Sequence, residues 1–373
     1  MGDSPLEGDA VKTAKALLIA MYIAGSAMPA IGQPDSVGSV GTSPPAIAQP
    51  ESAIRNPQSA IEGQTVIVVV GAAGTPEYAA QFAKGAGLWE QACVKSHANF
   101  VAVGLDENEG QSDRARLQGI LASRGGFETR PYQTSAALWL VLIGHGTFDG
   151  RAAKFNLRGP DISASDLAEW LKPVRRPIAV INTASSSAPF LKELSSPGRI
   201  VITATKSGFE QNFTRFGQYF AEAVIDPRAD LDKDGQTSLL EAFLSASHAV
   251  SEFYSAAGRL ATEHALLDDN GDGLGTPAEW FRGIRPVQKA RDDAALDGYR
   301  AHQLHLLYSE GETAMPPDRR ARRDQLELQV MALRDTRASL SDDDYFAKLE
   351  PLLREIARIY EQSDRHDSSG QSR

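Results

Sequence analysis

The sequence predicts an α/β protein: an open, mostly parallel sheet with helices on both faces, followed by EF-hand-like acidic loops and a C-terminal helical hairpin. Apolar runs rich in Val, Ile and Leu, typical of buried strands, lie at residues 66–70, 100–103, 138–143, 178–181 and 200–203. Helical patterns lie between or after them, at residues 113–121, 164–171 and 213–224, and Pro76 opens a further helix. Such alternation is typical of a parallel sheet that is covered on both faces.

The composition limits the classes of function. A chain of 373 residues can hold one sizeable α/β domain together with accessory elements. The formal net charge of −10 argues against nucleic acid as a partner and suits a protein that binds cations. Cys93 is the single cysteine, which excludes an internal disulfide and a cysteine-based zinc site.

The N-terminal region differs in amino-acid composition from the rest of the chain. Residues 1–30 resemble a signal peptide, because Lys12 and Lys15 precede an apolar run at 16–24 and small residues follow at the positions of a cleavage site. The run is short for a membrane span. We therefore expect export to the periplasm or the extracellular space, or a membrane tether if the segment is not cleaved; a short core helix is the alternative. Residues 31–63, rich in Pro, Ser and Gln, predict a disordered linker.

Two predicted strands end in residues that can carry chemistry. The strand at 138–143 leads to His145, which stands between two glycines and can act as a general acid or base. The strand at 178–181 runs into Asn182-Thr183-Ala184 and three serines, at 185–187. Ligand sites in open α/β sheets lie beyond the carboxyl ends of the strands, so both segments fall in the expected region.

These two segments and the run at 199–210 resemble the caspase-like cysteine peptidases of the CD clan, which include caspases, metacaspases and legumains. In that group one strand ends in His-Gly, and the next ends in an acidic residue, a small residue and the nucleophilic cysteine. The resemblance covers residues 64–227 and implies a caspase-like fold for them. It also implies that His145 stands at the position of the catalytic base.

The nucleophile of that family is missing. Ala184 stands at the position of the cysteine, and a methyl group cannot attack a carbonyl. Cys93 lies in an early predicted helix, far from the strand ends. We therefore interpret His145 as a relic and the chain as a catalytically inactive module that binds or scaffolds a protein or peptide partner.

The alternative is a peptidase-like hydrolase in which Ser185, or a neighbouring serine, uses His145 as its base. Against it, a shift of one residue past Ala184 turns the side chain to the other face of the strand. An unactivated serine also needs an oriented base. We favour a serine-rich turn that caps the next helix.

An acidic region at residues 228–284 predicts binding of Ca²⁺. Asp230, Asp232 and Asp234 fall at positions 1, 3 and 5 of a twelve-residue EF-hand loop, and Gly235 falls at position 6, where the chain must turn sharply. The remaining ligands of this set are the backbone carbonyl of Gln236, the side chain of Ser238, and Glu241 as a bidentate carboxylate.

The same spacing recurs in a second loop, through Asp268, Asn270, Asp272, Gly273, Leu274, Thr276 and Glu279. Position 8, where an aliphatic residue normally pairs two EF-hand loops, holds Thr237 in the first loop and Gly275 in the second. Two separate calcium clips therefore suit the sequence at least as well as one paired, sensor-type hand.

Residues 285–373 predict a helical tail. Pro316 and Pro317 mark a break, after which leucines recur every seven residues at 326, 333 and 340. Ser341 begins a capping box before a second helix. We expect an antiparallel hairpin whose leucine stripe forms its core; a face for self-association is the alternative. His302 and His305, three residues apart, have no convincing third metal ligand, and we interpret them as part of a solvated helix face.

Overall fold

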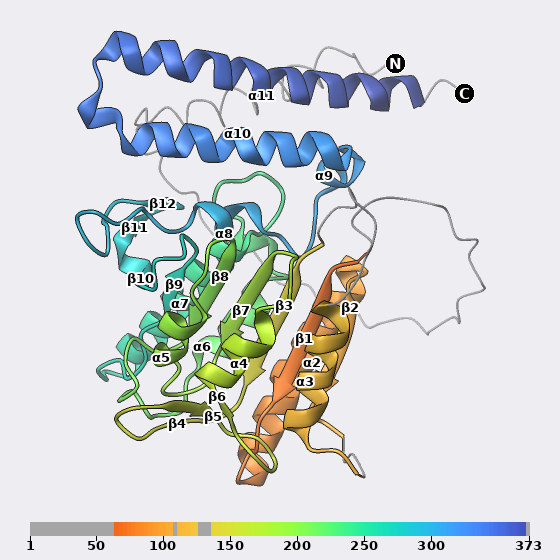
Figure 1. The fold of residues 1–373 in the computed structure, drawn as a ribbon, viewed down its shortest axis with the longest axis vertical. Helices are drawn as coiled ribbons and strands as arrows, with labels where there is room; N and C mark the ends of the chain where they lie inside the picture. The colour runs from red at the N-terminus through yellow and green to blue at the C-terminus, as the bar shows by residue number, and fades with distance from the viewer. Residues whose placement is uncertain (1–62, 107–109, 126–135, 371–373) are drawn as a thin grey trace, which may run out of the picture. The chain divides into compact units, whose positions relative to one another are not determined.

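The computed structural model describes residues 63–106, 110–125 and 136–370, and it confirms the predicted α/β class (Figure 1). Its main sheet has the strand order β10-β9-β8-β7-β3-β1-β2. The strands are β1 (Thr65–Val70), β2 (Asn99–Val103), β3 (Leu138–Ile143), β7 (Ile178–Asn182), β8 (Arg199–Thr203), β9 (Leu266–Asp268) and β10 (Thr276–Pro277). The five predicted strands all run parallel. The two short strands β9 and β10 were not predicted, and they extend the sheet in antiparallel sense.

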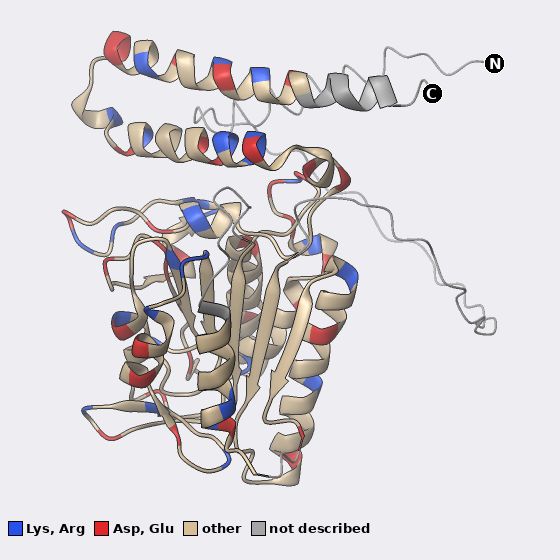
Figure 2. Cartoon of the chain, turned by 45° about the vertical axis from the view of Figure 1, so that its right-hand side comes forward, with Lys and Arg blue, Asp and Glu red and all other residues tan. Residues whose placement is uncertain are grey.

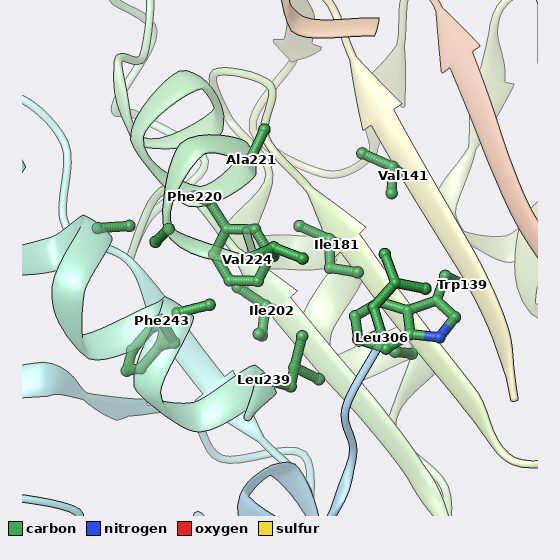
Figure 3. Packing of buried hydrophobic residues seen from close by; sticks show 14 of the residues in the cluster. Trp139, Val141, Ile181, Ile202, Phe220, Ala221, Val224, Leu239, Phe243 and Leu306 are labelled. Carbon is green, nitrogen blue, oxygen red and sulfur yellow. The ribbon is translucent and has the colours of Figure 1, made fainter. Parts of the chain in front are cut away.

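Side chains alternate between two cores, one on each face of the sheet. The α2-side core lies under α2 (Pro76–Ser96), α6 (Phe216–Ala223) and α7 (Leu239–Ala256). The α4-side core lies under α3 (Asp113–Gly125), α4 (Ala164–Leu171) and α5 (Ala188–Leu194). Along β7, Ala179 and Ile181 belong to the first core, whereas Ile178 and Val180 belong to the second. Figure 3 shows part of the α2-side core, where Phe220 and Phe243 from the helices lie over Ile181 and Ile202 of the sheet.

A small antiparallel sheet follows His145 and was not predicted. It consists of β4 (Gly146–Phe148), β5 (Ala153–Phe155) and β6 (Ile162–Ser163). Its strands are too short to give a periodic signal in the sequence. A two-stranded ribbon, β11 (Phe281–Arg282) with β12 (Arg285–Pro286), lies beyond the acidic loops.

The C-terminal region contains α8 (Tyr299–Gln303), α9 (Glu310–Ala314), α10 (Pro317–Asp335) and α11 (Asp342–Gly370). The last two lie side by side as the predicted hairpin (Figure 1), and Leu326 and Val330 of α10 are fully buried. Ser341 accepts a hydrogen bond from the amide of Asp344 at 3.1 Å, so the predicted cap is present. Both helices carry acidic and basic residues (Figure 2).

The hairpin of α10 and α11 is attached to the region around α8. Gln303 donates a hydrogen bond to the carbonyl of Asp324 on α10 at 2.8 Å, and the guanidinium of Arg320 lies over the ring of Tyr308. The signal-like segment at 1–30 lies outside the described residues, as does the linker apart from residue 63. Within the described ranges, no helix combines the length and apolarity that crossing a membrane requires.

Candidate functional site

The strand ends bring His145 and Ala184 to one edge of the sheet but not to one face. β3 and β7 are parallel neighbours, so both residues follow carboxyl ends. The ring of His145 packs edge-on against Tyr78 and Phe82 of α2, at 4.6 and 5.2 Å between ring centroids. Its Nε2 lies 3.3 Å from the carbonyl oxygen of Ala73. Ala184 is 1% exposed and belongs to the α4-side core.

Ser185 ties the two strand ends together. Its hydroxyl accepts a hydrogen bond from the amide of Gly146 and can donate one to the carbonyl of the same residue, both at 3.2 Å. A Cβ atom on Gly146 would stand 2.1 Å from the carbonyl oxygen of Ser185, so only glycine allows this approach. Within the described residues, no hydrogen bond joins His145 to the serines at 185–187. The hydroxyl of Ser185 is therefore occupied by hydrogen bonds to the backbone of Gly146.

The next two serines have different surroundings. Ser186 has a φ of 54°, in the left-handed region, and its buried hydroxyl has no hydrogen-bond partner. The hydroxyl of Ser187 lies 3.1 Å from that of Thr205 and accepts a hydrogen bond from the Thr205 amide. Ser187 precedes α5 but makes no side-chain cap. The expectation that the serines cap the next helix is therefore wrong, because the Ser187 hydroxyl is held by the loop after β8.

A carboxylate–histidine pair near these serines was missed in the sequence. Nδ1 of His264 lies 2.5 Å from a carboxylate oxygen of Glu210, whose backbone carbonyl accepts a hydrogen bond from the amide of Ser186. The neighbouring Glu263 is 2% exposed and accepts hydrogen bonds from the amides of Arg215 and Phe216. Burial raises the pKa of Glu263. Glu210 and His264 lie far apart in the chain, and no motif connects them.

The carboxylates of the first acidic loop lie close together. One ligand oxygen each from Asp230, Asp232 and Asp234 lie within 4.8 Å of one another. The carboxylate of Asp230 accepts hydrogen bonds from the amides of Asp234 and Gly235 at 3.2 and 3.0 Å. Gly235 has a φ of 91°, as the sharp turn at position 6 requires.

Glu241 closes this loop. One carboxylate oxygen accepts hydrogen bonds from the amides of Leu231 and Asp232, at 2.7 and 3.2 Å. The other accepts from Ser238, which begins α7 in a reciprocal capping box. The carboxylate of position 12 therefore lies against positions 2 and 3 of the loop. Gln236 is also held, since its side-chain oxygen accepts a hydrogen bond from the amide of Ser309.

The charges of this loop are poorly compensated by the protein. Burial, together with the nearby carboxylates of Asp234, Glu241 and Asp230, raises the pKa of Asp232 to about 7. A divalent cation would offset these negative charges, and oxygen-rich sites of this kind suit Ca²⁺.

The two histidines of the C-terminal region lie beside this loop. Nε2 of His302 lies 3.6 Å from a carboxylate oxygen of Asp232. His305 is 7% exposed, and its backbone forms an isolated antiparallel β-bridge with Ser238. Burial lowers the pKa of His305 to about 4. The interpretation of these histidines as a solvated helix face is therefore wrong, because α8 and the residues that follow it lie against the loop.

The second acidic loop has a different arrangement. Asp268 accepts hydrogen bonds from the amides of Gly271 and Gly273, Asn270 from the amide of Asp272, and Asp272 from the amide of Leu274. Glu279, expected at position 12, is exposed in a 3-10 turn (Ala278–Trp280), and no α-helix begins there. Across the described residues, the carboxylates of this loop form no group of three at metal spacing.

A carboxylate from outside the second loop braces it. Asp297 accepts hydrogen bonds from the amides of Asp269 and Asn270, and from the hydroxyl of Thr276 at 2.6 Å. Burial and the charge of Asp269 raise the pKa of Asp297 to about 8. In the described residues the two loops also do not pair with each other, since Ser238 next to Thr237 forms a backbone β-bridge with His305, and Thr276 next to Gly275 pairs with Leu267 of β9. The first loop is therefore the stronger candidate for a metal centre.

No protein-family model matches the chain, and no curated protein matches it. Among solved structures, the Drosophila initiator caspase Dronc is similar with 16% identity and a TM-score of 0.39, over 57% of this chain and 82% of that one. Caspase-1 from Spodoptera frugiperda is similar with 8% identity and a TM-score of 0.39, over 58% of this chain and 89% of that one. Both are caspases.

Proposed function

We propose that this chain is a calcium-binding module with a caspase-like α/β domain, which acts by binding a protein or peptide partner. The observation that carries the proposal is the first acidic loop, where oxygens of Asp230, Asp232 and Asp234 lie within 4.8 Å of one another. Glu241 lies over the same loop through its bonds to Leu231 and Asp232. The donor set consists of hard oxygens, which is the set that Ca²⁺ prefers.

A cation in this loop would stiffen the joint between the α/β domain and the tail. The loop follows α6 and runs into the start of α7, where Leu239 at its position 10 donates a hydrogen bond to the carbonyl of Leu304 at 2.8 Å. Gln236 of the same loop bonds to Ser309 before α9. Binding of Ca²⁺ would therefore order residues that contact both parts, and its free energy would add to the stability of the native state.

We assign the second loop a weaker role. Asp268, Asn270, Asp272, the carbonyl of Leu274 and Glu279 remain the candidate ligands, but Glu279 lies apart from the turn that the first three form. The brace supplied by Asp297 holds this loop through protein contacts. We expect it to contribute less to calcium-dependent stability than the first loop.

The test is a thermal melt of the full chain with Ca²⁺ or with chelator. At a free Ca²⁺ concentration about 100 times Kd, binding stabilises the native state by about 2.7 kcal/mol, which raises Tm by roughly 5 °C. Asp230→Ala should abolish this rise and Asp268→Ala should keep most of it. Asp292→Ala, at an exposed position outside both loops, is the matched control. The proposal fails if Ca²⁺ gives no rise, or if Asp230→Ala keeps it.

The hydrolase alternative has one observation in its favour. Ser186 lies in a strand-to-helix turn between β7 and α5, with positive φ and an unpartnered hydroxyl. A fluorophosphonate probe tests it: labelling that Ser186→Ala abolishes would support a serine nucleophile. His145→Ala and His264→Ala would then distinguish the two histidines. Absence of labelling supports the non-catalytic module.

The proposed location and partner rest on the sequence alone. A signal-like segment at 1–30 and a linker at 31–63 suit an exported protein whose folded part is tethered or released. Self-association through the tail is the further proposal for its helical hairpin. Sedimentation of the full chain with and without residues 317–373 would test that proposal.

A further inference from the structure

A large cavity lies at the amino ends of the strands, on the edge opposite to His145 and the serines. Its volume is about 870 Å³. Ile178 of β7 and Arg199 of β8 line one side, and Gln303 and Ala321 of the C-terminal helices line another. Cavities of about 300–1,000 Å³ are typical of sites for small molecules.

Basic side chains dominate the charged lining. The cations are Lys172, Arg175, Arg176, Arg199, Arg300 and Arg320, and the only carboxylates in the lining are Glu193 and Asp324. Asp324 is already paired with Arg323, at 2.6 Å. The whole chain has a formal net charge of −10, so this concentration of positive charge is local and opposite in sign.

Among the lining cations, Arg199 gives the clearest evidence of an unpaired charge. Its guanidinium donates to the carbonyls of Leu194 and Leu171, at 2.7 and 3.5 Å, and its buried Nε has no partner. Burial lowers the pKa of Arg199. In the described part of the chain, neither Arg199 nor Arg175 nor Arg300 forms an ion pair. Buried cations are normally paired, because an unpaired charge is costly to remove from water.

We propose that this cavity binds a small polyanion of the phosphate class. Arginine forks match the oxygens of phosphate groups, and several of them around one volume suit a ligand with more than one negative charge. The ligand would offset the charges of Arg175, Arg199 and Arg300, since Lys172 and Arg320 already pair with Glu169 and Glu312. It would also contact both the α/β domain and the tail, since Arg199 and Arg300 belong to these two parts. No residue of either acidic loop lines the cavity.

The test is calorimetric titration of the full chain with sodium pyrophosphate in calcium-free buffer, at ionic strength held constant with NaCl. Arg175→Gln and Arg300→Gln change exposed side chains, so the variants should fold. Each should weaken binding about tenfold, the loss expected for one charge-assisted hydrogen bond. Arg151→Gln, an exposed arginine in the β4–β5 turn, removes the same charge outside the cavity and should bind as the wild type does.

Two results would overturn the proposal. One is the absence of saturable binding of pyrophosphate at millimolar concentration. The other is an equal loss of affinity in Arg151→Gln and in the cavity variants, which would indicate attraction by overall charge alone. Circular dichroism of each variant checks that a loss of binding does not come from unfolding.

Discussion

His145 and Ala184 follow adjacent parallel strands, yet they contact opposite faces of the sheet. The ring of His145 packs on Tyr78 and Phe82 of α2, whereas the methyl group of Ala184 belongs to the α4-side core. The reason is that side chains alternate between the two faces along a strand, so residues that are out of register on neighbouring strands can point to different faces. Two residues that share an edge of the sheet therefore do not by themselves form a catalytic pair.

We predict that Ala184→Cys will not create a reactive thiol. Position 184 is 1% exposed, and His145 is turned towards the carbonyl of Ala73. A thiol there would lack both an oriented base and access for a reagent. Mass spectrometry after iodoacetamide treatment at pH 7.5 measures this, with unfolded protein as the positive control. Rapid alkylation of the folded variant at position 184 would contradict the prediction.

Gly146→Ala should destabilise the protein by about 1–3 kcal/mol, the usual cost of overpacking. The added methyl group would meet the carbonyl oxygen of Ser185 at 2.1 Å. Gly87→Ala on α2 is the matched control, because a methyl group there meets nothing within 4 Å. That control should be neutral or stabilising by up to about 1 kcal/mol. Denaturant unfolding measures both, and equal stability of the two variants would contradict the prediction.

Ser186→Gly should leave the stability unchanged or raise it by up to about 1 kcal/mol, because glycine relieves the left-handed backbone. The substitution also removes a buried hydroxyl that has no partner. Ser187→Ala should instead cost about 1 kcal/mol, since it removes the bond from the Thr205 amide. Thermal unfolding distinguishes the two. A large loss of stability in Ser186→Gly would contradict the prediction, because it would mean that the Ser186 hydroxyl makes a stabilising contact.

Gly235→Ala should weaken Ca²⁺ binding and cost about 1–2 kcal/mol of stability, because Gly235 has a φ of 91°. A methyl group there meets no atom within 4 Å, so the cost comes from the backbone alone. Gly119→Ala on α3 is equally free of contacts and should stabilise by about 0.5–1 kcal/mol. Melts with and without Ca²⁺ separate the two effects. Unchanged calcium stabilisation in Gly235→Ala would argue against the first loop as the site.

The thiol of Cys93 should make stability fall at alkaline pH. Burial, with a smaller effect of Glu90, raises the pKa of this thiol to about 12. The group ionises near pH 9 when unfolded, so its stabilising effect is complete below that pH and is lost as the pH rises towards 12. The loss is at most about 1.4 kcal/mol for each pH unit. Urea midpoints at pH 8 and 10.5 for wild type and Cys93→Ala measure it; parallel changes in both proteins would refute it.

The sequence by itself determined the five parallel strands and the main helices. The run at Leu138–Ile143 matches β3 at both ends, and α4 matches at both ends as well. Apolar runs and caps such as Ser341 are local signals, and a buried strand or a helix start requires them wherever the chain goes. The separation into an α/β domain and a hairpin tail follows from the same signals.

Only the tertiary structure decided which residues meet. Glu210 pairs with His264, His302 lies beside Asp232, and Asp297 braces the second loop, although none of these pairs is close in the sequence. Each contact depends on how distant segments of the chain come together in the folded protein, which periodicity does not encode. The face of the sheet that His145 and Ala184 each contact was also decided by the tertiary structure, because it depends on the residue at which each strand ends.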